Sequence, residues 1–205
     1  MSTTRDRIFK AARVLFDKHG VEGLSMRRLA GAVGITPMAI YKHFPGKSAL
    51  LDALMLDGFV HWEARIRAIR KKDPLAWLKA MMQEALDFAL AEPHRYEAAF
   101  LLPASQARRY PTDFEAGRSP AVNLAYQRIE EAQRQGKLTA TPAFDMVLTF
   151  SALSQGLVTM SRAGRFVSEA ECRKAYRRTL EHAFAAYTVA PRDWPAPWSA
   201  RLPQR

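Results

Sequence analysis

The residues best suited to chemistry in this chain lie in one short segment, 36–43. Helical spacing there buries Ile40 and Phe44 and leaves four larger side chains on the outer face: Met38, Tyr41, Lys42 and His43. This surface is unusual for a soluble protein, but it suits a helix that enters the major groove of DNA. An apolar first turn can contact thymine methyl groups, while the polar groups reach phosphates or base edges.

The residues around this segment predict the helices that must position it. Gly34 is a turn residue, and Thr36 can cap the next helix while Pro37 occupies its first position, where a missing N–H costs nothing. The Pro-Gly pair at 45–46 breaks the chain again. We therefore predict a three-helix, helix-turn-helix unit over residues 1–46.

This segment resembles the DNA-binding head of the TetR family of bacterial transcription regulators. The resemblance is specific over about residues 5–56, and it implies an all-α fold with an N-terminal DNA-binding head and a helical ligand-binding and dimerisation body. It further implies that Tyr41 and Lys47 contact phosphates. The residues that carry the resemblance are Phe16, Gly20, Arg28, Leu29, Ala30, Val33, Gly34, Ile35, Tyr41, Phe44, Lys47 and Leu50.

Ten residues form the expected DNA contact set. Lys47 begins a helix, where free N–H groups also favour an anion. The arginines can equally be solvated helix charges, Tyr41 can be half-buried packing, and His43 can be a surface residue without a role. The full set is Arg27, Arg28, Thr36, Pro37, Met38, Ala39, Tyr41, Lys42, His43 and Lys47.

The charge distribution also favours a DNA-binding head. The chain of 205 residues has a net charge of +11 and a pI near 10.1, which suits a nucleic acid or an acidic membrane surface as partner. A merely basic soluble protein would have the same composition. However, residues 1–50 contain nine of the 31 basic and three of the 20 acidic side chains, so more than half of the net charge lies in the first quarter.

The remainder of the chain predicts helices and no strand pairs, which makes the fold all-α with about nine helices. A long helix from about residue 47 to 72 leaves the head, and residues 103–118 are predicted to form a loop. We divide the chain into a DNA-binding domain at 1–46, an effector-binding and dimerisation domain at 47–190, and a Pro-rich tail at 191–205.

The last two predicted helices, at about 142–164 and 169–187, indicate a homodimer. A helix with almost no charge, followed by one with an apolar stripe, suits a four-helix interface between two copies. Alternatively, both helices complete the core of a single chain. The predicted interface residues are Phe150, Leu153, Leu157, Tyr176, Leu180 and Phe184.

Large adaptable side chains in the body indicate an apolar pocket, although each is equally suited to an ordinary core. The resemblance implies a small-molecule effector, and we expect it to be apolar or amphipathic. The candidate pocket residues are Trp62, Trp77, Met81, Met82, Gln83, Phe88, Phe100, Gln127, Met146 and Gln155.

An enzyme is not expected, because the five histidines have no HExxH spacing and neither GxSxG nor a phosphate loop is present. We expect no cofactor or metal, no membrane span and a cytoplasmic protein. The predicted function is a ligand-responsive regulator, a repressor that binds a palindromic DNA operator as a dimer and is released by its effector. The alternative is a helical adaptor recruited through the Trp/Pro tail, without sequence-specific DNA binding.

Overall fold

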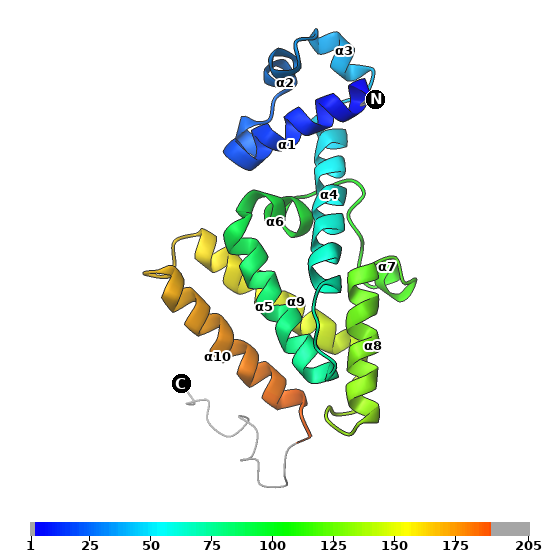
Figure 1. Cartoon of the computed structure of the whole chain (residues 1–205), viewed down its shortest axis with the longest axis vertical. Coiled ribbons are helices and arrows are strands. Elements are labelled where there is room, and N and C mark those ends of the chain that lie inside the picture. The colour runs from blue at the N-terminus through cyan, green and yellow to red at the C-terminus, as the bar shows by residue number, and fades with distance from the viewer. Residues whose placement is uncertain (1–2, 190–205) are drawn as a thin grey trace, which may run out of the picture.

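A computed structural model describes residues 3–189, so the predicted tail at 191–205 lies outside the described residues. This part of the chain forms ten α-helices (Figure 1), and a single antiparallel bridge joins Leu138 and Thr188. The helices are α1 (Thr4–Gly23), α2 (Met26–Val33), α3 (Pro37–Tyr41), α4 (Lys47–Arg67), α5 (Pro74–Ala91), α6 (Pro93–Phe100), α7 (Thr112–Glu115), α8 (Pro120–Arg134), α9 (Ala143–Arg162) and α10 (Glu169–Tyr187).

The molecule is elongated, with α1–α3 gathered at one end (Figure 1). Helix α4 leaves this head and runs along the body. Helix α5 lies in the middle of the body, with α10 on one side and α8 on the other. The end of α10 and the loop after α8 lie at the end of the body that is far from the head.

The predicted all-α class is confirmed, with two differences in detail. Residues 103–118 are not entirely a loop, because Pro111 is followed by α7, whose first turn carries Asp113 and Glu115. Helix α4 ends at Arg67 and not near residue 72. The guanidinium of Arg70 donates to the Arg67 carbonyl at 2.7 Å and so satisfies one of the free acceptors at this helix end.

The head has a core of its own, which α4 and α6 complete. Ile40 and Phe44 are buried, as their spacing predicts, and they pack with Phe16 and Leu29. Leu50 and Leu54 of α4 and Ala98 of α6 belong to the same cluster. The head is therefore held on the body by apolar packing that continues past residue 46.

The body core is built around α5, which is apolar nearly all round and buries side chains on most sides. Helix α9 packs on α10, α8 and α5, and its buried residues Met146, Phe150, Ser154 and Val158 follow one another at i, i+4 spacing along a single side. By length and composition alone α9 could cross a membrane, a test that core helices of soluble proteins also pass. In this fold it belongs to the helical bundle.

Helix α4, which carries the head, packs tightly against α6 of the body. Gly58 of α4 lies against Ala99 and the backbone of Arg95. A Cβ atom at Gly58 would come within 2.9 Å of the Ala99 Cβ and 3.1 Å of the Arg95 carbonyl oxygen. The absence of a side chain is therefore what lets the two helices touch.

We predict that Gly58→Ala destabilises the protein by about 1–3 kcal/mol, because the new methyl group overpacks a contact with backbone. The matched control is Gly31→Ala in α2, where nothing lies within 4 Å of the added Cβ. That control should gain about 0.5–1 kcal/mol from better helix propensity. Urea unfolding measures both, and equal effects of the two substitutions would contradict the close-contact interpretation.

Candidate nucleic-acid interface and internal pocket

Side-chain caps fix the turn between α2 and α3. The Ser25 hydroxyl accepts from the backbone N–H of Arg28 at 3.2 Å, and the Thr36 hydroxyl accepts from that of Ala39 at 3.2 Å. Between these caps, Gly34 adopts a left-handed conformation with φ of 74°, which glycine reaches without a steric penalty. The predicted helix-turn-helix geometry thus follows from local sequence.

Helix α3 presents a continuous exposed surface on a buried base. Met38 is 72% exposed and Tyr41 45% exposed, although both are large and partly apolar, while Ile40 between them is fully buried. Lys42 and His43 follow, both exposed. Of the other predicted contacts, Arg27, Arg28, Thr36, Pro37 and Lys47 are exposed and Ala39 is half-buried.

Three of the predicted DNA contacts already have partners within the head. The Lys47 ammonium donates to the Val21 carbonyl at 2.8 Å, and a guanidinium N–H of Arg28 donates to the Gly23 carbonyl at 3.5 Å. Both carbonyls lie at the end of α1, so these cations help to hold α1 against α2 and α4. The Thr36 hydroxyl is occupied as a cap. Each cation keeps further N–H donors.

Two further basic residues near the start of α1, Arg5 and Arg7, are not part of the predicted DNA contact set. The Arg5 guanidinium lies 5.0 Å from the centre of the Phe44 ring, and Arg7 donates to the carbonyl of Val33 at 3.3 Å. They tie the first turn of α1 to the ends of α2 and α3. No sequence signal distinguishes them from solvated helix charges.

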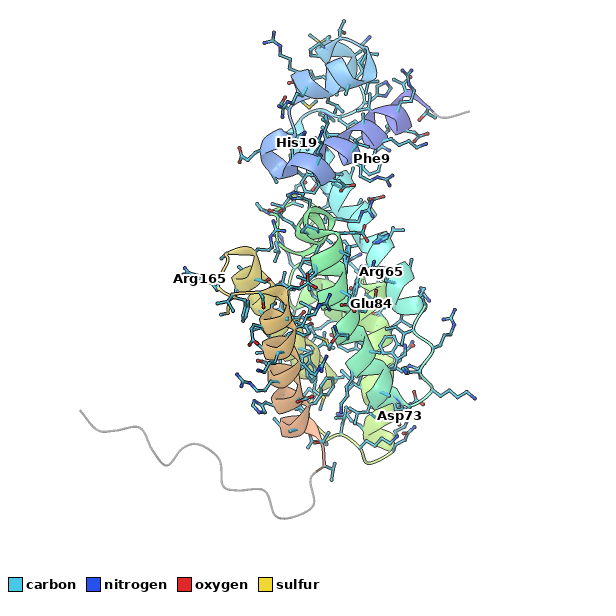
Figure 2. All side chains as sticks on the ribbon, turned by 60° about the vertical axis from the view of Figure 1, so that its left-hand side comes forward. Phe9, His19, Arg65, Asp73, Glu84 and Arg165 are labelled. Atoms are coloured by element: carbon cyan, nitrogen blue, oxygen red, sulfur yellow. The ribbon has the colours of Figure 1, made fainter. Side chains whose placement is uncertain are left out.

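Charged side chains from α1, α4, α5 and α6 meet where the head joins the body. Arg95 of α6 lies 3.8 Å from Asp17 of α1 and 3.6 Å from Asp57 of α4. Arg65 of α4 donates to Glu84 of α5 at 2.6 Å, and Figure 2 shows these two side chains next to each other between the two helices. We call this set of ion pairs, together with those of Glu92, the junction network.

Glu92 accepts three contacts in the junction network. One of its oxygens lies 2.8 Å from His61 Nε2 and 3.1 Å from Arg65, and the other contacts Arg95. Burial raises the pKa of Glu92, but the hydrogen bond with His61 and the charges of His61, Arg95 and Arg65 outweigh it, so the pKa lies below its ordinary value of 4.5. The carboxylate is thus held in its charged form.

The body contains a cavity of about 320 Å³, partly open to solvent, between α4, α5, α6, α8, α9 and the segment that contains α7. Its walls are mostly apolar. The structure brings five of the ten candidate pocket residues to this cavity: Trp62, Met81, Met82, Phe100 and Gln155.

The other five candidates do not line this cavity. Trp77, Phe88 and Met146 are packed in the body core. Gln83 donates to Asp87 at 3.3 Å along α5, and Gln127 is exposed on α8. The pattern of large apolar residues identified buried positions, but it did not distinguish a cavity wall from a filled core.

Several cavity residues come from the segment predicted as a loop. Arg108, Tyr110 and Phe114 belong to it, and Phe144 at the start of α9 contacts the Tyr110 ring with 4.7 Å between centroids. Phe59 of α4 completes this group. The only signal in the sequence was the presence of aromatic residues in a loop that is otherwise polar.

Four predicted dimer residues are used inside the single chain. The Phe150 ring packs against the Phe184 ring with 4.3 Å between their centroids, and Leu180 is buried in the same core. The Tyr176 hydroxyl bonds with Ser154 at 2.7 Å and donates to the Met82 carbonyl at 2.8 Å. In the single chain these side chains have almost no exposed surface that a second chain could contact.

The opposite side of α9 remains uncovered in the single chain. Leu148 and Met160 are 45% and 46% exposed, and Ala152 and Gly156 lie exposed between them. The two remaining predicted interface residues, Leu153 and Leu157, are half-buried. Small and apolar residues therefore form an exposed stripe along α9 that carries no charge between Leu148 and Met160.

Comparison with known families covers both parts of the chain. The family model described as "Bacterial regulatory proteins, tetR family" matches residues 8–54, and that described as "Tetracyclin repressor-like, C-terminal domain" matches residues 78–183. The chain belongs to the TetR family. It is thus a helix-turn-helix transcription regulator of a family whose members bind DNA, dimerise and bind small effectors, and are generally not enzymes.

Curated relatives match part of the chain. The chain is 39% identical over 105 residues to the HTH-type transcriptional repressor DrrR1 of Streptomyces coeruleorubidus, covering 51% of this chain and 36% of that protein. It is 38% identical over 64 residues to the HTH-type transcriptional regulator UidR of Escherichia coli, covering 31% and 33%. The chain thus spans about a third of the length of these relatives.

Solved structures resemble almost the whole chain. A protein of unknown function from Rhodococcus sp. RHA1 superimposes with a TM-score of 0.72 at 26% identity, covering 91% of this chain and 96% of that one. A TetR variant from Acinetobacter baumannii, solved in complex with minocycline, has a TM-score of 0.64 at 20% identity and coverages of 90% and 95%. The latter likeness concerns the fold alone.

We predict that acid weakens this TetR-family protein partly through Glu92. Because its pKa is lower in the folded chain, its stabilisation is present above the unfolded value of about 4.5 and is lost as the pH falls through the folded value. Glu92→Gln should reduce the free energy of unfolding by about 1–2 kcal/mol at neutral pH. On acidification, the variant should lose less stability than the wild type does. Urea unfolding from pH 7 to pH 3 tests this, with the exposed Glu130→Gln as control, and parallel curves for Glu92→Gln and wild type would contradict it.

Proposed function

We propose that this protein is a ligand-responsive transcriptional repressor that binds a near-palindromic operator as a homodimer in the cytoplasm. The observation that carries the proposal is the surface of α3, where Met38 and Tyr41 are exposed on either side of a fully buried Ile40. A helix held by its apolar base, with large side chains in solvent, is suited to the major groove.

The proposed DNA contacts divide into two groups. Met38, Ala39 and the apolar first turn of α3 contact thymine methyl groups, and Arg27 or Lys42 adds hydrogen bonds to base edges. Tyr41, His43 and Lys47 contact phosphates. Helix α4 supports this second role, because Gly46 provides no side-chain cap and the first N–H groups of α4 can receive an anion.

The two groups predict different effects of substitution. Lys47→Ala should reduce the affinity for all DNA sequences alike and lower the slope of log affinity against log salt by about one unit, since each neutralised phosphate contributes about 0.9. Met38→Ala should instead relax the preference at one base pair and leave the slope unchanged. Lys72→Ala, an exposed lysine beyond the end of α4, is the control.

The experiment that tests the proposal is selection of bound DNA from a random pool, followed by these salt titrations. Enriched sites should contain two half-sites whose centres are about 34–36 Å apart or a multiple of that distance. A protein that enriches no sequence is an adaptor, and the repressor proposal then fails. Lys47→Ala must also be checked by thermal unfolding, because its ammonium holds the end of α1.

We assign the dimer contact to the exposed stripe of α9. Two copies of α9 and α10 can form a four-helix bundle, in which the stripe around Ala152 and Gly156 is covered by the partner. The absence of charge between Leu148 and Met160 supports this, because charged residues are depleted at the centres of interfaces. Leu153 and Leu157 would form the edge of this contact.

We predict that Ala152→Glu produces a folded monomer with weak operator binding, because a charge would be buried at the proposed contact. The side chain is exposed in the single chain, so the fold itself should tolerate the change. Ala64→Glu on the exposed face of α4 is the matched control and should stay dimeric. Sedimentation velocity measures both, and a dimeric Ala152→Glu protein would remove this stripe from the interface.

The cavity of the body is the proposed effector site. Met55, Phe59 and Trp62 of α4 line it, whereas Leu50 and Leu54 of the same helix pack in the head core. Helix α4 therefore spans both sites over about 31 Å, at about 1.5 Å per residue. Release requires a ligand that prefers the state in which the two heads no longer fit the operator, with a coupling of about 1–3 kcal/mol.

A further inference from the structure

One charged side chain, Arg108, lines the cavity of the body. All other lining residues in the described chain are uncharged, and most are apolar. We propose that Arg108 makes this cavity selective for a small carboxylic acid with an apolar body. The inference rests on the proposed function of the cavity as the effector site, and it specifies the chemistry of the effector.

Arg108 lies in the wall of the cavity without an ion-pair partner. Its guanidinium carbon lies 4.3 Å from the centre of the Phe59 ring, an arrangement that holds the cation against an aromatic face. Within residues 3–189, no carboxylate oxygen lies within 4.0 Å of it and no hydrogen bond involves its side chain. Arg65 in the junction network, by contrast, contacts both Glu84 and Glu92.

The acidic residues whose charge acts on Arg108 are engaged elsewhere. Asp113 accepts from the Arg118 guanidinium at 2.6 Å and from the backbone N–H of Arg109 at 2.6 Å. Glu63 pairs with Arg67 at 2.7 Å, one turn further along α4. The donors of Arg108 are therefore left for a group that enters from outside.

Burial of this cation has a cost that an anionic ligand would offset. Desolvation lowers the pKa of Arg108, and Asp113 and Glu63 compensate only in part. A guanidinium remains charged in proteins, so this desolvation cost disfavours the folded state unless an anion offsets it. Its planar N–H donors can bind both oxygens of a carboxylate, so a carboxylate complements Arg108 in charge and in geometry.

The rest of the cavity determines the body of the ligand. A volume of about 320 Å³ lies at the lower end of the range for small-molecule sites, and aromatic and aliphatic side chains form most of the wall. A single cation neutralises one negative charge, which favours a monoanion over a phosphate dianion. No acidic side chain lines the cavity in the described chain, so an amine would find no counter-charge.

Matched probes can test the charge preference by isothermal titration. The probes are octanoate, octanol and octylamine, and 4-phenylbutyrate with its alcohol and amine, all at a pH of about 7, where the acids are ionised. Each acid should bind wild-type protein about 10-fold to 100-fold more tightly than its alcohol, and the amines should bind least. Arg108→Gln should abolish the preference for the acid.

Three further variants make the test decisive. Arg109→Gln changes the exposed neighbouring arginine and should keep the wild-type preference. Arg108→Lys keeps the positive charge but lacks the planar pair of N–H donors, so it should keep part of the preference for the acid. Ser151→Trp places a large side chain in the cavity wall and should abolish binding of acids and alcohols alike. Thermal unfolding confirms that each variant is folded.

The outcomes separate the two proposals. If the alcohols bind as tightly as the acids, or if folded Arg108→Gln keeps the preference, the role of Arg108 is overturned while the cavity remains an effector site. If no probe binds, or if Ser151→Trp binds every probe as the wild type does, the cavity is not the effector site. Both proposals then fall.

Discussion

The contact between α4 and α6 at Gly58 is the constraint on which the other features depend. Helix α4 carries the head at one end and part of the cavity wall at the other, and among the helices of the described chain it packs most extensively on α6. Ala99 and the Arg95 carbonyl lie so close to Gly58 that an added Cβ atom would clash with them, so the two helices have little room to shift against each other. The junction network adds charged contacts around the same crossing.

The head core and the cavity of the body meet at the end of α6. Ala98 is buried in the head core, Ala99 lines the cavity, and Leu102 packs against the head core and also lines the cavity. Asp52 near the head accepts hydrogen bonds from Ser105 and from the backbone N–H of Gln106, which lie in the segment that carries Arg108. The cavity wall and the DNA-binding head are therefore connected by a few residues in direct contact.

Local signals in the sequence were sufficient for the head. The caps at Thr36 and Pro37 and the spacing of Ile40 and Phe44 each depend on residues within one or two turns, and the structure has them as predicted. Contacts between residues that are far apart in the sequence could not be predicted from such local signals. The apolar stripe of α10 correctly indicated burial, but only the fold reveals that Tyr176 meets Ser154 of its own chain. The place of Arg108 likewise depends on the path of a segment without periodicity.

The segment between α6 and α7 contributes side chains to the cavity wall but no helix to the bundle. Ala107, Arg108 and Tyr110 line the cavity but lie outside every helix, so the helical frame does not depend on their identity. Substitutions at these three positions can therefore change the chemistry of the cavity wall without repacking the helical bundle. For the proposed effector site, this makes them the natural place to redesign the protein as a biosensor for a chosen compound.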